Sequence, residues 1–166
     1  MKMNLKLKKP DPDLSEREFY LRSFTWGLPV NLGGALVAAG LLLTGHKPER
    51  YGNCVNFTVG KNWGGGSMGI FMLTCKNATD RLKAHEHGHS IQNCFYGPLM
   101  PLINLQSSSR FLFRKGVETI FPKKRLPPYD SAWFEGEATK LGTAYMKRKT
   151  NQAQGVRRVS GKEKQP

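Results

Sequence analysis

Two histidines and a glutamate in the middle of the chain have the spacing of a zinc-hydrolase motif. His85, Glu86 and His89 fit the pattern H-E-x-x-H, in which two imidazoles lie one helical turn apart on the same face of a helix. Such a pair can bind one Zn²⁺, and the glutamate beside the first ligand can act as general base. His87 points to nearly the opposite side of that helix and is not expected to be a ligand.

A catalytic zinc site takes three protein ligands, so the motif needs a partner from elsewhere in the chain. The extended pattern H-E-x-x-H-x-x-G-x-x-H does not supply it, because Gln92 and Phe95 stand where its Gly and third His would be. The other histidine, His46, adjoins an apolar segment, and a downstream carboxylate is therefore the better candidate. The carboxylates considered are Glu118, Asp130, Glu135 and Glu137.

Glycine positions point to the helix that supplies the third ligand. Gly88 lies inside the motif helix, where glycine costs about 1 kcal/mol, which indicates that another element packs closely against it. Glu135 shares one face of the last predicted helix with small residues that include Gly142, and a close crossing would bring its carboxylate to the two imidazoles. We therefore favour Glu135 over Glu137, which can instead pair with Lys140 at i,i+3 on the surface.

Further polar residues could complete such a site. A phenol often helps to hold the oxyanion that forms during peptide hydrolysis, and the candidates are Tyr145, Tyr129 and Tyr96, which the sequence does not rank. Gln92 and Asn93 could hold the metal ligands in place through hydrogen bonds, although solvation on the surface of the helix is the simpler account.

Hydrophobic periodicity indicates the elements that must position these residues. Residues 55–59 and 70–74 alternate as half-buried strands do, and glycines at 64–66 predict a turn between them, so the pair is expected to form a β-hairpin. The motif lies on a helix over 77–96, and a last helix spans 131–149. We expect an α+β fold in which the hairpin, a small sheet, packs on the pair of zinc-binding helices.

An uncharged segment over 26–45 has the length of a membrane helix. The stretch from Thr25 to Thr44 has twenty uncharged residues, which matches the ~20 that a spanning helix needs, and Trp26 stands at its entry, where interfacial aromatics lie. We expect a transmembrane or membrane-associated helix there, with a buried core helix as the alternative. Lys and Arg are too evenly spread on its two sides to orient it.

Positive charge is concentrated at the two ends of the chain. Of the formal net charge of +14, residues 1–10 carry +4 and residues 147–166 carry +6, which favours an anionic membrane surface as partner over nucleic acid. We expect a flexible basic arm over 1–25, a zinc-metallopeptidase-like domain over 51–149 and a disordered basic tail over 150–166.

The three cysteines are too few and too odd in number for a disulfide scaffold. Cys54 and Cys75 could face each other across the predicted hairpin, but the leftover Cys94 favours three free thiols.

Two stretches of the sequence resemble a group of small, poorly characterised bacterial proteins with an H-E-x-x-H…E zinc-peptidase-like core. They read H-E-H-G-H-S-I-Q-N-C-F-Y-G-P-L-M-P-L and, further on, Y-D-S-A-W-F-E-G-E-A, and the resemblance covers roughly residues 51–145. In the wider gluzincin class the third ligand lies in Glu-x-x-(Ser/Ala), which residues 135–138 match, so the resemblance also implies Glu135. The chain departs from the group at residues 105–108, which lack the group's Pro.

The resemblance also implies a place for substrate. In zinc peptidases an extended substrate commonly adds as a strand beside an edge strand that lines the cleft. The segment 68–74 could be that edge, and the residues assigned to it are Met68, Gly69, Ile70 and Phe71. A hairpin that only covers the zinc helix is an equally good interpretation.

Together these features predict a membrane-associated, zinc-dependent metallopeptidase that acts on a peptide or protein. Zn²⁺ on His85, His89 and Glu135 would lower the pKa of bound water and polarise the scissile carbonyl, while Glu86 takes the proton. A non-catalytic zinc-binding scaffold protein is the first alternative, and a basic nucleic-acid-binding protein is the second. We expect the chain at a membrane, spanning or peripheral, or else in the cytoplasm.

Overall fold

The computed structural model describes residues 9–123 and 125–162, with side chains as far as residue 152. It confirms the α+β class, with one mixed sheet among helices. In chain order the elements are α1 (Glu16–Phe24), α2 (Leu28–Leu43), β1 (Pro48–Tyr51), β2 (Cys54–Thr58), β3 (Gly65–Met68), β4 (Phe71–Thr74), α3 (Asp80–Tyr96), η1 (Gly97–Leu99), α4 (Met100–Ile120), η2 (Tyr129–Ser131) and α5 (Trp133–Lys162).

The four strands lie in the order β1-β2-β4-β3. β2 and β4 are parallel, with Val55 opposite Phe71, so the prediction that 55–59 and 70–74 form a hairpin is wrong. The glycine-rich stretch is itself the edge strand β3, which pairs antiparallel with β4. The tight turn falls at Gly69, whose φ of +67° is the left-handed conformation that a two-residue hairpin loop requires.

α2 is fixed to the turn between β3 and β4 by a buried asparagine. The amide nitrogen of Asn31 donates to the carbonyl oxygen of Ser23 (2.8 Å), and its amide oxygen accepts from the N–H of Ile70 (2.8 Å). One turn further on, a Cβ added to Gly34 would lie 2.3 Å from the carbonyl oxygen of Met68, so only glycine permits this approach. One face of α2 is therefore part of the fold.

The predicted transmembrane helix over 26–45 is not supported. α2 has 16 residues, and within the described part of the chain no single helix is both long and apolar enough to cross a bilayer. α1 and α2 meet those criteria only as a pair, and the two helices are bent by 90° relative to each other.

Most of the described part of the predicted basic arm over 1–25 is structured instead of flexible. Residues 16–24 form α1, whose Phe19 and Ser23 are buried. Ser15 caps this helix, because its hydroxyl oxygen accepts from the N–H of Glu18 (3.2 Å). The arm prediction failed because a buried phenylalanine stabilises the segment despite its charges. The first part of the predicted arm, residues 1–8, lies outside the described residues.

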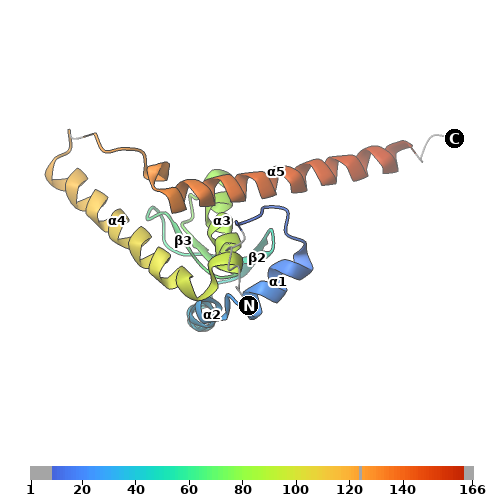
Figure 1. Ribbon diagram of the computed structural model, residues 1–166, viewed down its shortest axis with the longest axis horizontal. Helices are drawn as coiled ribbons and strands as arrows, with labels where there is room; N and C mark the ends of the chain where they lie inside the picture. Colours follow the sequence, from blue (N-terminus) through green and yellow to red (C-terminus); the bar gives the residue numbers. More distant parts are fainter. Residues whose placement is uncertain (1–8, 124, 163–166) are drawn as a thin grey trace, which may run out of the picture.

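α5 is longer than the sequence predicts. It continues to Lys162 and extends beyond the other elements (Figure 1), so the prediction of a disordered tail over 150–166 is wrong for residues 150–162. Residues 163–166 lie outside the described residues.

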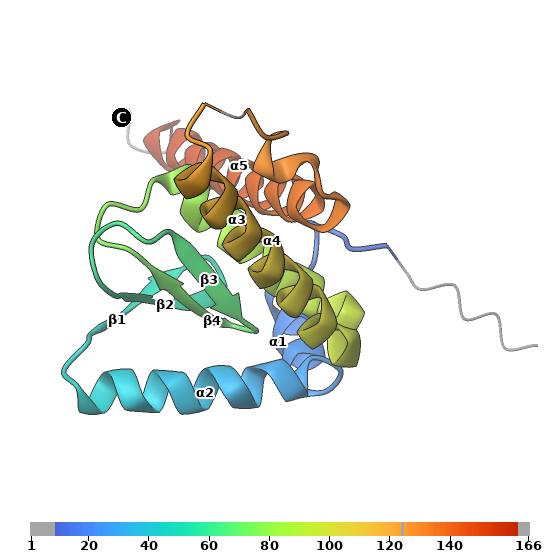
Figure 2. The ribbon, with the colours of Figure 1, turned by 90° about the vertical axis from the view of Figure 1, so that its left-hand side faces the viewer.

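The core lies where the sheet meets α3. Figure 2 shows the sheet between α2 on one side and α3 with α5 on the other. Met72 of β4 is buried in one hydrophobic cluster with Ile91 and Phe95 of α3. Cys54 and Cys94 belong to the same cluster, and all three cysteines are buried and free, as predicted.

Candidate metal centre

The two helices predicted to supply the metal ligands cross at backbone contact. A Cβ added to Gly88 of α3 would lie 1.9 Å from the carbonyl oxygen of Ala138, and one added to Gly142 of α5 would lie 1.7 Å from that of Ala84. No side chain fits at either position, so the two glycines set the separation of the helices. The close crossing predicted from Gly88 is confirmed.

The crossing brings His85, His89 and Glu135 together. One oxygen of Glu135, Oε2, lies 3.0 Å from Nε2 of His85 and 3.3 Å from Nε2 of His89. One candidate ligand atom from each residue lies within 4.8 Å of the other two. The carboxylate has no exposed surface and the imidazoles have little, so the group could hold one metal ion. Two imidazole nitrogens and a carboxylate oxygen are a donor set of catalytic zinc sites.

Hydrogen bonds around His89 determine which of its nitrogens carries the proton. The side-chain nitrogen of Gln92 donates to the carbonyl oxygen of Phe134 (2.9 Å) and to Glu137 (2.8 Å), which directs the amide oxygen to Nδ1 of His89 (2.8 Å). An amide oxygen only accepts, so we assign the proton to Nδ1, and Nε2 of the neutral ring has a lone pair. That lone pair faces the anionic Glu135, an arrangement that requires a proton or a metal ion between them. The residues therefore fit a cation.

The other members of the cluster are held in a similar way. Nδ1 of His85 lies 2.8 Å from the hydroxyl of Thr139, and that hydroxyl lies 3.4 Å from Asp130. Ser107 of α4 donates its hydroxyl to the second oxygen of Glu135. Neither Thr139 nor Ser107 was predicted as a site residue. Thr139 could have been found, because it stands one helical turn after Glu135, whereas nothing in the local sequence marks Ser107.

The electrostatics of the cluster favour an ionised Glu135. Burial alone would raise the pKa of Glu135, but the hydrogen bonds from His85 and His89, together with the charge on His89, outweigh burial and lower it. Burial, the largest single influence, lowers the pKa of His89, but its hydrogen bond to Glu135, the charges of Glu86 and Glu135 and the bond to Gln92 together outweigh burial and raise it. Glu86 behaves differently, because burial raises its pKa despite the two nearby imidazoles. The site thus holds two carboxylates side by side, Glu135 with a lowered pKa and Glu86 with a raised pKa.

A cleft of about 910 Å³ opens over the cluster. Its lining includes His85, Glu86, His89 and Glu135, the edge strand β3 and the inner side of α4. Strand and general-base candidate are in close contact, since a Cβ added to Gly65 would lie 2.9 Å from Oε1 of Glu86.

The predicted substrate edge is only partly correct. The free edge along the cleft is β3, which contains Met68, whereas Gly69 and Ile70 form the turn. Phe71 lies in β4, which is paired on both sides, by β2 and by β3. The segment 68–74 is therefore not the edge, because parallel pairing with β2 places β4 inside the sheet.

The structure separates the three tyrosines that were considered as oxyanion donors. Tyr129 lines the cleft, with its hydroxyl 3.1 Å from that of Ser107, and burial raises its pKa to about 12. Tyr96 is not among the residues that line the cleft, and its hydroxyl donates to Glu137 (2.8 Å).

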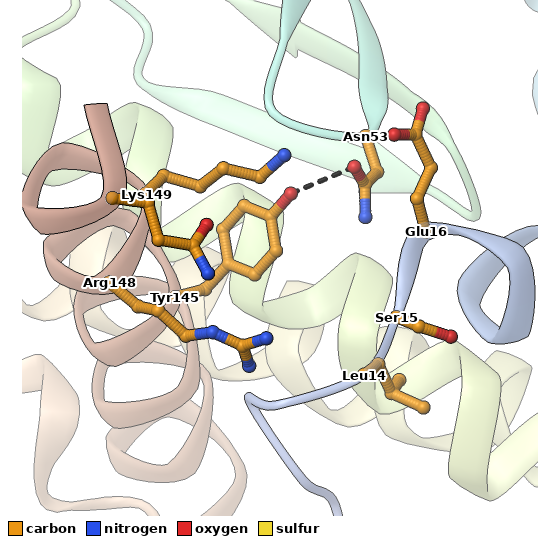
Figure 3. Close-up of a pocket in the computed structure, with 8 residues that line it drawn as sticks. Leu14, Ser15, Glu16, Asn53, Tyr145, Arg148 and Lys149 are labelled. Atoms are coloured by element: carbon orange, nitrogen blue, oxygen red, sulfur yellow. Dashed lines mark hydrogen bonds between the residues drawn. The ribbon is translucent and has the colours of Figure 1, made fainter. Parts of the chain in front are cut away.

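Tyr145 faces away from the cleft, so its predicted role is wrong. It lies ten residues after Glu135, which on a helix is about 15 Å further along and about 80° around the axis. Its hydroxyl donates to Asn53 (2.8 Å) in a separate pocket of about 170 Å³ beside Lys149 (Figure 3). Its ring stacks on His87, 4.2 Å between centroids, on the opposite side of α3 from the metal cluster, as predicted for His87.

Glu137, the alternative third ligand, supports the cluster from outside. Its carboxylate accepts from Gln92 and from the hydroxyl of Tyr96, each at 2.8 Å. The predicted Glu137–Lys140 ion pair does not occur among the described residues. Glu137 thus orients Gln92, which in turn orients His89.

Comparison with known proteins adds no relative to this description. No model of a protein family matches the chain, and neither the curated proteins nor the solved structures include a match.

Proposed function

We propose that this chain is a zinc-dependent peptidase, with His85, His89 and Glu135 as the metal ligands and Glu86 as the general base. The observation that carries the proposal is the placement of Glu86 beside the three-residue cluster in one cleft. A bound Zn²⁺ would supply Lewis acidity and lower the pKa of a water molecule. The ordering of the two histidines by Gln92 and Thr139 supports a site that is ready to bind such an ion.

The chain's own residues would divide the remaining work. Glu86, whose pKa burial raises, is a stronger proton acceptor than an exposed carboxylate and would take the proton of the attacking water. Tyr129 remains protonated at neutral pH, because its pKa is about 12, and it could donate a hydrogen bond to a developing oxyanion. Both groups line the cleft in which a scissile peptide would lie.

The edge strand supports a peptide as the substrate. β3 pairs with β4 on one side only, and its other side is available for main-chain hydrogen bonds to an extended peptide. Its residues Gly65, Gly66 and Ser67 are small, which leaves room for the peptide's side chains. Apolar groups around the cleft favour apolar substrate side chains, and they are Trp63, Met68, Leu73, Leu82, Phe111 and Leu112.

The test combines metal analysis with peptide turnover on the purified full chain. We expect about one zinc per chain, and loss of both zinc and turnover in His89→Ala. Glu86→Gln should keep the zinc and lower turnover of a peptide library by about 10²- to 10⁴-fold. Glu118→Gln is the matched control, because Glu118 lines the same cleft but pairs with Arg114.

Two results would contradict the proposal. Absence of stoichiometric zinc in the wild-type chain would remove the metal site. Zinc binding without peptide turnover by the wild-type chain, with the zinc content unchanged in Glu86→Gln, would leave the chain as a zinc-binding scaffold.

A further inference from the structure

The outer face of α2 is an uncovered row of leucines. Asn31, Gly34 and Ala38 face the rest of the fold and are buried, whereas Leu32, Leu36 and Leu43 are 58%, 77% and 89% exposed. The helix contains no charged residue, and its outer face lies away from the sheet (Figure 2). Apolar helix faces of this kind are normally buried against something else.

The charges around α2 identify the kind of partner. Residues 19–48 contain no Asp or Glu, and exposed or half-exposed cations lie beyond both ends of the helix, Arg22 before it and Lys47 after it. Cations that border an apolar helix face match the negative surface of an anionic bilayer. Trp26, which is half exposed at the entry to the helix, is an aromatic residue that prefers the level of the lipid headgroups.

A second copy of the chain fits this face less well. Two copies with a net charge of +14 each repel one another, and pairing two α2 faces would bring Arg22 and Lys47 of each copy near those of the other. An anionic lipid surface instead attracts the same cations.

We propose that α2 docks the chain on an anionic membrane surface, lying in the plane of the bilayer with Leu32, Leu36 and Leu43 among the acyl chains. The opposite face of α2 is attached to the turn between β3 and β4 through Asn31 and Gly34. The sheet and the other helices would therefore stay on the water side of the docked helix. This proposal is independent of the peptidase proposal, because α2 contributes no residue to the metal cluster.

Vesicle flotation of the purified full chain tests the docking. We expect binding to vesicles of phosphatidylcholine with phosphatidylglycerol, weak binding to phosphatidylcholine alone, and weaker binding to the anionic vesicles as salt rises from about 0.1 M to about 0.5 M. The double variant Leu32→Ser/Leu36→Ser should bind about tenfold less or weaker still, because it loses two apolar side chains from the lipid contact.

Two further variants control for loss of folding and for nonspecific lipid binding by exposed apolar side chains. Leu43→Ser alters the most exposed leucine of α2, cannot disturb the core, and should also reduce binding. Ile120→Ser is the matched control, because Ile120 is 69% exposed at the end of α4 that lies far from α2 (Figure 1), and it should bind as the wild type does. Equal losses in Ile120→Ser and the α2 variants, or no loss in Leu32→Ser/Leu36→Ser, would overturn the proposal.

The orientation and the alternative occupant are tested separately. In Thr25→Cys and Thr44→Cys, an impermeant thiol reagent outside the vesicles should label both introduced cysteines. The native cysteines are buried and should add no signal. Protection of one position only would show a spanning helix and overturn in-plane docking. Sedimentation of the wild type without lipid should show a monomer. A dimer that the Leu32→Ser/Leu36→Ser variant abolishes would assign the face to a second copy instead.

Discussion

Acidification should destabilise the folded chain through His87, the histidine of the motif that faces away from the candidate metal ligands. Its side chain is fully buried between Phe19 and Tyr145, and its Nδ1 has no hydrogen-bond partner among the described residues. Burial, followed by the charge of Lys149, lowers the pKa of His87 from 6.5 to about 4. The unfolded chain therefore takes up this proton at a higher pH than the folded chain, and the stability is complete above about pH 6.5 and falls as the pH drops toward 4.

The size of the effect follows from the two pKa values. The difference between 6.5 and about 4 corresponds to about 3 kcal/mol of unfolding free energy in total, of which about 2 kcal/mol is lost between about pH 7 and about pH 5. Urea unfolding, followed by tryptophan fluorescence at several pH values, measures it in the wild type and in His87→Gln. Release of any bound metal and titration of other groups affect both proteins, so the difference between their curves isolates residue 87. Parallel curves would refute the assigned pKa.

Two further predictions concern the crossing and the support of the cluster. Gly88→Ala should lower the free energy of unfolding by about 2 kcal/mol or more, because its Cβ would overlap the backbone of α5, whereas Gly116→Ala, with open space around it, should raise it by up to about 1 kcal/mol. Urea denaturation compares them, and equal effects would count against the close crossing. Gln92→Leu should weaken zinc binding about 10- to 100-fold by removing the acceptor for His89, and Tyr145→Phe should leave it unchanged. Titration calorimetry measures the affinities, and a wild-type affinity in Gln92→Leu would contradict the assigned role.

The parts of the fold that depend on helical spacing could be predicted from the sequence. The i,i+4 histidines fix one face of α3 wherever that helix lies, and Gly88 marks the point at which a second helix approaches. Once that crossing is inferred, Glu135 is the carboxylate on the small-residue face of the partner helix. Within each helix the inference uses residues at most a few turns apart, which is the range over which helix geometry is reliable.

The arrangement of the strands could not be predicted in the same way. A period of two assigns side chains to the faces of a strand but does not specify the direction in which its neighbour runs, so β2 and β4, which are parallel neighbours, were expected to form an antiparallel hairpin. β3 escaped notice because glycine has a low strand propensity, and three consecutive glycines resemble a turn. Ser107 was missed for a related reason, since its contact with Glu135 depends on how α4 packs, which local pattern does not determine.

The two glycines at the crossing of α3 and α5 also affect the order of events during folding. His89 and Glu135 are 46 residues apart, and closing a loop of that length has an entropic cost that only the docking of the two helices offsets. Before docking, an ion would find the two imidazoles on a single helical turn without the carboxylate of Glu135. Metal binding by all three residues would therefore follow the docking, and a bound ion would then slow the separation of α3 from α5.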